Sequence, residues 1–131
     1  MITNKEYAAR RKELMSSMHS NSIAIISSAP EKIRSRDTHY PYKQNVNLSY
    51  LCGFPEPESV LVLIPGREQG EMVLFCRDKD PLRETWDGYR EGPGGAVTNF
   101  GADDAFPITD IDDILPNLIE GKDRLYYAIG K

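Results

Sequence analysis

Short runs of apolar residues predict five strands along the chain. Residues 22–27 are apolar and β-branched, and residues 60–64 are apolar at every position, which is typical of a central strand covered on both faces. Residues 72–76 follow a turn that contains two glycines and are expected to pair antiparallel with the strand before them. A last strand is expected over 124–129, and a proline confines a shorter one over 105–108 to an edge or a strand start.

Helical spacing and capping signals predict helices between these strands. Thr3 and Glu6 form a capping box, so an amphipathic helix is expected over 4–17 with its charged face outward. Asp80 is followed by a proline, which is tolerated at a first helical position, and together they predict a short helix that extends to about Trp86.

Three further segments complete the predicted fold. A helical turn is expected near 46–51, and a helix capped by Asp110 has its apolar residues on one side, although Pro116 removes an amide from its middle. Residues 92–95, Gly-Pro-Gly-Gly, are expected to form a loop. Helices that alternate with strands predict an α/β fold: a mixed sheet of about five to six strands with helices on both faces, in a single domain over 1–131.

Composition and charge argue against several classes of partner. The net charge of −4, without a basic stripe, argues against nucleic acid. No apolar run approaches the roughly 20 residues of a membrane span, and the charged N-terminal segment lacks the apolar stretch of a signal peptide. Cys52 and Cys76 have neither a CxxC nor a zinc spacing, which favours two buried thiols in a reducing compartment. We therefore expect a cytoplasmic protein that binds neither nucleic acid nor membrane.

The sequence contains no recognisable catalytic machinery or metal site. His19 and His39 belong to no ligand pair, and phosphate-loop and nucleophile-elbow motifs are missing. Cys52 as a nucleophile would need a base, and His39 is the single candidate. The aspartates at positions 103, 104, 110, 112 and 113 are explained better by capping and a solvated face than by a hard-cation cage. This chain is not expected to act as an enzyme alone.

The segment 34–58 is rich in both aromatic and charged residues. Three prolines fix its backbone at separate points, so it should have one shape. Long loops that carry their own packing groups are more often functional than ordinary loops. The segment is therefore predicted to be a site-like loop or a large structural plug. The residues expected to shape it are Arg34, Tyr40, Tyr42, Gly53, Phe54 and Glu58, and Arg90 is expected to be a further structural loop residue.

The single tryptophan lies in a second distinctive segment. Trp86 is followed by Asp87 and Gly88, a helix-ending signal that places the indole near a loop tip. An exposed tryptophan near Arg83 and Arg90 suits an interface or a pocket wall, since Trp and Arg are enriched at binding hot spots. The alternative is a tryptophan that anchors a helix to the sheet.

Together, the two segments resemble the N-terminal domain of the Xaa-Pro aminopeptidase (aminopeptidase P) family, and the resemblance covers nearly the whole chain. Its motifs are Arg34-Ser-x-Asp37-x-x-Tyr40-Pro-Tyr-Lys-Gln-Asn45, Tyr50-Leu-Cys-Gly-Phe54-x-Glu-Pro-Glu58, Leu74-Phe75, Arg77-Asp78 and Glu84-x-Trp86-x-Gly88-x-Arg90. Two residues depart from the family pattern: Lys43 stands where arginine is more frequent, and Cys52 where threonine is usual. Both affect packing more than chemistry.

The resemblance implies an enzyme longer than this chain. Members of the family hydrolyse the bond between an N-terminal residue and a following proline in peptides. They carry a C-terminal pita-bread domain with a two-metal site, usually manganese, held by Asp, His and Glu ligands. By resemblance, the chain is a cut-out N-terminal domain that holds no catalytic residue and no metal, is inactive alone, and has its own C-terminal catalytic domain as partner.

The resemblance also implies roles in assembly and substrate access. In the family, this domain packs into dimers or tetramers and lends residues to the mouth of a neighbouring subunit's active site. By motif position, Trp86 resembles the tryptophan that walls the neighbour's cleft, and Asp37 resembles the acidic residue beside it. An indole gives a proline ring an apolar wall, and a carboxylate can orient an ammonium or a guanidinium group. For Asp37, a brace to Arg34 or Arg36 or an Asx turn is an equal alternative.

Two other functions stay open at this point. The first is a catalytically dead creatinase-like module that binds peptides or proteins; a downstream region with or without the metal ligands would separate it from the enzyme. The second, weaker alternative is a free-standing α/β ligand-binding domain, which no cofactor motif supports.

Overall fold

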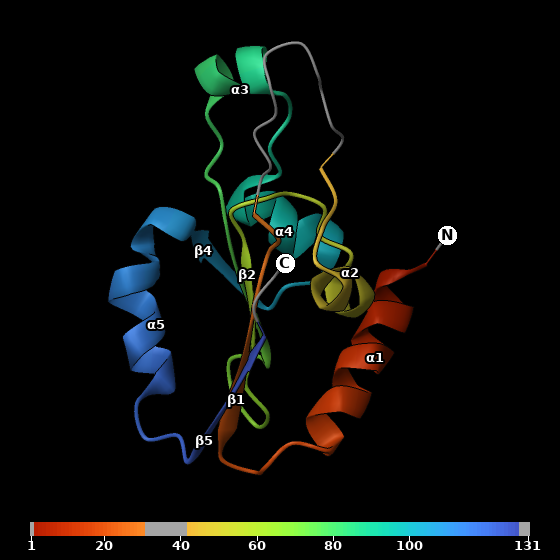
Figure 1. Cartoon of the computed structure of the whole chain (residues 1–131), viewed down its shortest axis with the longest axis vertical. Coiled ribbons are helices and arrows are strands. Elements are labelled where there is room, and N and C mark those ends of the chain that lie inside the picture. Colours follow the sequence, from red (N-terminus) through yellow and green to blue (C-terminus); the bar gives the residue numbers. More distant parts are fainter. Residues whose placement is uncertain (1, 31–41, 129–131) are drawn as a thin grey trace.

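Five strands form one mixed sheet in the computed structural model, which describes residues 2–30 and 42–128 (Figure 1). The strand order is β4-β3-β2-β1-β5. The strands are β1 (Ser22–Ser27), β2 (Val60–Leu63), β3 (Met72–Cys76), β4 (Asp104–Pro107) and β5 (Arg124–Ala128). The β1–β2 and β2–β3 pairs are antiparallel, whereas β3–β4 and β1–β5 are parallel. The predicted mixed sheet is confirmed, and the strand that contains the proline lies at an edge.

Side-chain alternation along the strands divides the buried residues into two cores. In β1, Ala24 and Ile26 belong to one core, while Ile23 and Ile25 belong to the other. Successive side chains of a strand point to opposite faces, so a sheet that is apolar on both faces needs a layer of helices on each. The near-continuous apolar character of β1, β2 and β3 therefore determines the three-layer arrangement.

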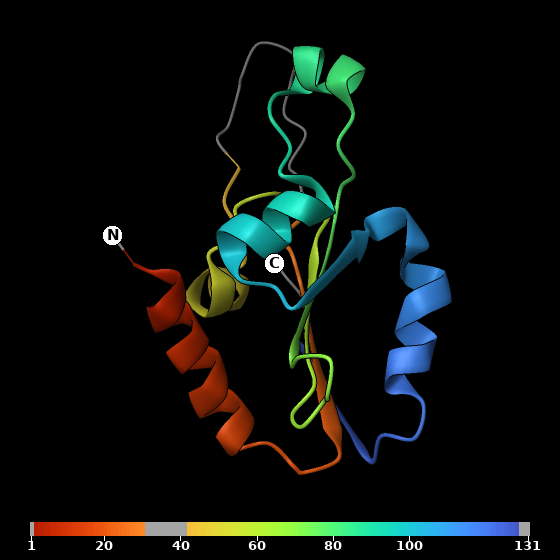
Figure 2. The same cartoon turned by 180° about the vertical axis from the view of Figure 1, so that it is seen from behind.

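Helices cover both faces of the sheet, as predicted (Figures 1 and 2). One face carries α1 (Asn4–Ser16), α2 (Val46–Cys52) and α4 (Gly92–Phe100). The other carries α5 (Ile111–Ile119), which follows a turn of 3-10 helix, η1 (Ile108–Asp110). The remaining helix, α3 (Pro81–Asp87), stands apart from both layers at one end of the molecule.

The prediction of a loop at residues 92–95 is wrong, because these residues form the first turn of α4. Gly92 enters the helix with φ +70°, and the proline that follows needs no hydrogen-bond partner in a first turn. Ala96 is fully buried against the sheet. The Phe100 ring packs edge-on against the ring of Phe54, with 5.0 Å between the ring centroids. Tertiary packing thus stabilises a helix that its glycines would disfavour in isolation.

The charged face of α1 is only partly exposed, in contrast to the prediction. The side chain of Arg11 is buried, and its guanidinium donates a hydrogen bond of 2.9 Å to the carbonyl of Leu51. Arg10 donates to the carbonyl of Tyr50 at 3.0 Å and lies 4.3 Å from the centroid of that ring. The last carbonyls of a helix lack intrahelical partners and carry partial negative charge, so the two arginines lock α1 onto the end of α2. Burial lowers the pKa of Arg11.

Several finer expectations can be compared with the structure. Cys52 and Cys76 are both buried free thiols, as predicted, and burial raises their pKa values to about 11 and about 12. Asp110 occupies the N-cap position of α5, but its side chain makes no capping hydrogen bond, because a 3-10 turn precedes the helix. Among residues 2–30 and 42–128, none of the helices is long and apolar enough to cross a membrane.

Candidate functional site

Among the described residues, the most exposed aromatic side chain lies on a projection that we call the α3 arm, residues 77–91. The arm leaves the sheet at the end of β3, includes α3 and returns to the start of α4 (Figure 1). The carboxylate of Asp80 accepts the amide of Arg83 at 3.3 Å, so it caps α3 as predicted. Trp86 is 86% exposed, which confirms its expected place near a tip and excludes an indole anchored in the sheet. Leu82, four residues before Trp86, and Tyr89, three residues after it, are also exposed.

Glu84 connects the two legs of the α3 arm. Its carboxylate accepts the amide of Asp80 at 3.1 Å and the ammonium of Lys79 at 2.9 Å, both from the leg that enters α3. It also accepts the amide of Arg90 at 3.0 Å, from the leg that leaves. The Arg90 amide and, next, the Lys79 ammonium lower the pKa of Glu84 to about 2. The group is therefore a carboxylate at neutral pH, with donors from both legs.

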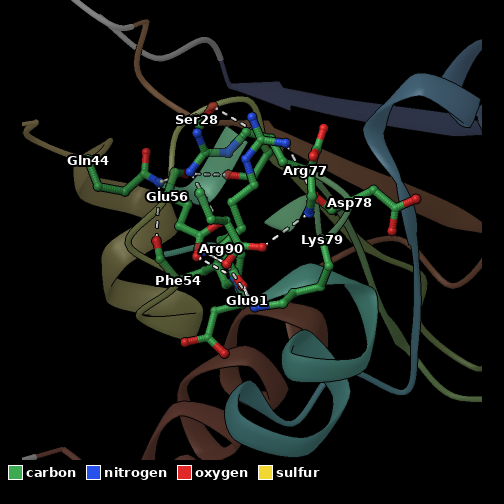
Figure 3. Close-up of polar contacts among 12 residues, drawn as sticks. Ser28, Gln44, Phe54, Glu56, Arg77, Asp78, Lys79, Arg90 and Glu91 are labelled. Carbon is green, nitrogen blue, oxygen red and sulfur yellow. Dashed lines mark hydrogen bonds and ion pairs between the residues drawn. The ribbon is translucent and has the colours of Figure 1, made fainter. Parts of the chain in front are cut away.

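Glu56 performs a similar role at the base of the α3 arm (Figure 3). This buried carboxylate accepts the Glu91 amide at 2.8 Å and pairs with the Arg77 guanidinium at 3.4 Å. Arg90 donates to the carbonyl of Asp78 at 3.2 Å. The base thus joins the end of β3, the start of α4 and the loop after α2. Within the described part of the chain, the Nε atoms of Arg77 and Arg90 are buried without a hydrogen-bond partner.

Hydrogen bonds hold together residues 42–58, the described part of segment 34–58, and the choice between a site-like loop and a structural plug stays a prediction. The centre of these hydrogen bonds is Gln44, whose amide donates to the carbonyls of Phe54 at 3.1 Å and Glu56 at 2.8 Å. The Gln44 oxygen accepts the amide of Ala29 at 3.0 Å and the hydroxyl of Tyr42 at 2.9 Å. One amide side chain therefore ties the end of β1 to the loop that supplies Glu56.

The residues predicted to shape this segment have different environments. Gly53 ends α2 with φ +72°, and Phe54 is fully buried. Glu58 is exposed and has φ +53°, an uncommon conformation for a glutamate. Arg34, Tyr40 and Asp37 lie outside the described residues, so their roles, including the one proposed for Asp37 beside Trp86, stay predictions.

Sequence reasoning missed the two carboxylates that hold the α3 arm. Glu84 carried a usable signal, because an acidic residue one turn after the capping Asp80 can reach back to the start of the helix. Glu56 carried none, since its partners Arg77 and Glu91 are 21 and 35 residues away along the chain. Glu56, Glu84 and Gln44 all belong to the family motifs, but none of the three was assigned a role.

An open groove of about 740 Å³ lies elsewhere, between α1, α2, β1 and β5. Its lining includes Leu14, Tyr50, Leu51 and Tyr126. None of the predicted site residues that the structure describes lines this groove. The groove and the α3 arm are therefore separate features of the surface.

The aspartate-rich positions serve structural roles where their contacts are described. Asp103 accepts the amide of Met72 at 2.9 Å, and Asp104 pairs with Arg67 at 2.8 Å. In residues 2–30 and 42–128, no three His, Cys, Asp or Glu side chains are grouped so that they could hold a metal ion. The two-metal site that the resemblance implies is expected in the C-terminal catalytic domain and not among these residues.

Comparison with known proteins identifies the family. The model of the family described as "Aminopeptidase P, N-terminal domain" matches residues 7–126. The chain belongs to this family. The resemblance expected from the motifs is thus confirmed, and so is the α/β fold.

Members of the family with known sequences and structures match nearly the whole chain. The Xaa-Pro aminopeptidase of Escherichia coli (strain K12) is 40% identical over 131 aligned positions, covering 99% of this chain and 30% of that protein. Human Xaa-Pro aminopeptidase 3 is 34% identical over 138 aligned positions, covering 96% of this chain and 27% of its own length. The structure of Pseudomonas aeruginosa aminopeptidase PepP superimposes with a TM-score of 0.93 at 62% identity, over 97% of this chain and 29% of that one. This chain thus spans about three tenths of the length of these relatives.

Proposed function

We propose that the chain is the N-terminal, non-catalytic domain of a manganese-dependent Xaa-Pro aminopeptidase, in which it supports oligomerisation and gates access of substrate. The α3 arm carries this proposal, because α3 lies apart from the sheet (Figure 1) and its Trp86 is 86% exposed. Large exposed aromatic side chains on a projecting element are typical of binding surfaces rather than of fold stabilisation. The substrate class, peptides with proline second, follows from the names of the relatives.

The catalytic metal belongs, in this proposal, to a C-terminal catalytic domain that is the first partner of the chain. The described residues offer no grouped ligands, and one solved relative is a zinc-substituted aminopeptidase P of E. coli in complex with product. Bound metal would supply an activated water and polarise the scissile carbonyl. The chain contributes binding and orientation of substrate, and it is inactive by itself.

Trp86 acts, in this proposal, as an apolar wall at the mouth of a neighbouring subunit's cleft. An indole packs well against a proline ring and the side chain next to it, and it loses water when substrate enters. Asp37 would stand beside it and orient the free ammonium of the substrate or an arginine at the rim. Because the wall comes from another subunit, a dimer or tetramer is required for a complete cleft.

In this proposal, strand β5 offers a surface for the C-terminal catalytic domain of the full-length enzyme. It is an edge strand with exposed apolar side chains, among them Leu125 and Tyr127. Exposed sheet edges are usually paired or covered in native proteins, which favours contact with a further part of the enzyme.

A cytoplasmic location is proposed from the free buried thiols, although a relative in Arabidopsis thaliana is named as mitochondrial.

The alternative function is a catalytically dead creatinase-like module that binds peptides or proteins. It would use the same exposed arm without catalysis. The names of the curated relatives, Xaa-Pro aminopeptidases and intermediate cleaving peptidases, favour the enzyme.

The proposal predicts a specific kinetic defect for Trp86→Ala in the full-length enzyme. We expect KM for a peptide with proline second to rise roughly tenfold, the factor that corresponds to about 1.4 kcal/mol of lost contact, with kcat little changed. The melting temperature should stay that of the wild type, because the side chain is 86% exposed. Steady-state kinetics and thermal melting check both parts; an unchanged KM, or an unfolded variant, would contradict the proposal.

A further inference from the structure

The position of Trp86 has to be set by the α3 arm, because little of the protein surrounds the indole. The side chain is 86% exposed, so packing cannot hold it in one place. Helix α3 has seven residues, which is too short to be stable without outside support. A wall that receives substrate needs a fixed location, since small displacements of positioning groups weaken catalysis strongly. Something within the arm must therefore make it rigid.

Glu84 is oriented to supply that rigidity. Residues two apart on a helix point about 200° from each other, so Glu84 and Trp86 project from opposite sides of α3. The side chain of Glu84 is 13% exposed and faces the legs of the arm, whereas that of Trp86 faces away. The turn of helix that presents the indole on one side is therefore held to the legs of the arm by Glu84 on the opposite side.

The contacts of Glu84 cross the arm where two glycines with positive φ flank the returning leg. Gly88 and Gly92 flank the returning leg with φ +99° and +70°, conformations in which glycine has wide freedom. Glu84 Oε1 accepts both the Arg90 amide and the Lys79 ammonium, and Lys79 in turn donates to the Arg90 carbonyl at 2.7 Å. These charge-assisted bonds close the returning leg against the entering one.

We infer that Glu84 is a positioning residue that fixes Trp86 by joining the two legs of the α3 arm. Glu56 holds the base of the arm at the sheet, and Glu84 holds the outer half, two residues from the indole. The effect on catalysis rests on the proposed function of Trp86, but the mechanical effect on the arm does not. The two can be tested separately.

The mechanical test uses the 131-residue chain, in which Trp86 is the single tryptophan. Time-resolved fluorescence anisotropy then reports the motion of this indole alone. Glu84→Gln keeps the size of the side chain but removes its charge and one acceptor oxygen. We expect a larger fast component of depolarisation in Glu84→Gln, and no change in Glu68→Gln, an exposed glutamate on the β2–β3 turn. Equal anisotropy decays in wild type and Glu84→Gln would overturn the inference.

The kinetic test uses the full-length enzyme and a double-mutant cycle. We expect Glu84→Gln to raise KM roughly tenfold, as Trp86→Ala does, while the double variant shows no further rise because both changes remove one function. A Glu84→Gln effect that persists in the Trp86→Ala background would overturn the inference. If Trp86→Ala alone leaves KM unchanged, the proposed function fails, and the anisotropy experiment still decides the role of Glu84.

A second pair of variants covers the case in which Glu84→Gln does not fold. Lys79→Met removes the cation that Glu84 binds, and Lys79→Arg replaces it with another. We expect Lys79→Met to reproduce the mobile indole and Lys79→Arg to restore the wild-type decay. Identical behaviour of the two variants would count against the charged contact as the fixing element.

Discussion

Phe54→Ala should lower the free energy of unfolding by about 4 kcal/mol, the usual scale for removal of a buried aromatic ring. The ring is fully buried and meets the ring of Phe100 edge-on at 5.0 Å, so its loss opens a cavity between α2 and α4. Since native domains are stable by about 5–15 kcal/mol, this one change removes a large fraction of the total. Urea denaturation measures it directly.

Trp86→Ala is the matched control for Phe54→Ala. It also removes an aromatic ring, but one that is 86% exposed, and should change stability by no more than about 0.5 kcal/mol. Equal losses in the two variants would contradict the placement of Phe54 in the core and of Trp86 outside it.

Gly53→Val should destabilise the protein by about 3 kcal/mol through two separate effects. Gly53 ends α2 with φ +72°, a conformation that costs a β-branched residue about 1–2 kcal/mol. In addition, a Cβ at this position would lie 2.6 Å from Cζ of Tyr7, so the side chain would press against α1. The midpoint of chemical denaturation, compared with the wild type, gives the sum of both effects.

Gly66→Val separates the two contributions. Gly66 has φ +81°, but no atom lies within 4 Å of a Cβ placed there. This variant should therefore show the conformational cost without the steric one and lose about 1–2 kcal/mol. If Gly53→Val lost no more free energy of unfolding than Gly66→Val, the close approach of Gly53 to Tyr7 would not constrain the fold.

The regular elements were predictable because local signals agree with the tertiary structure. The apolar run of β1 gave its bounds, 22–27, and Asp80 with the following proline gave the start of α3. The exposure of Trp86 followed from Asp87 and Gly88, which end the helix directly after it. In each case neighbouring residues in sequence carry the information.

The elements that could not be predicted depend on contacts between distant residues. Helix α4 begins with Gly-Pro-Gly-Gly, which locally favours a loop, and forms because Ala96 lets its backbone lie close to the sheet. The burial of Arg11 depends on a carbonyl 40 residues away. The support of the α3 arm depends on Glu56, whose partners Arg77 and Glu91 are 21 and 35 residues away along the chain. Local propensity contains none of this information.

Kinetics of mixed oligomers test the central claim, that Trp86 serves the cleft of a neighbouring subunit, most directly. Full-length Trp86→Ala enzyme would be mixed and reassembled with a second variant that retains Trp86 but lacks the metal ligands of its catalytic domain. If the indole acts across subunits, the inactive partner should supply it, and activity with the wild-type KM should appear. If every mixture retains the raised KM of Trp86→Ala alone, the indole does not act on a neighbour and the proposed role of the arm is wrong.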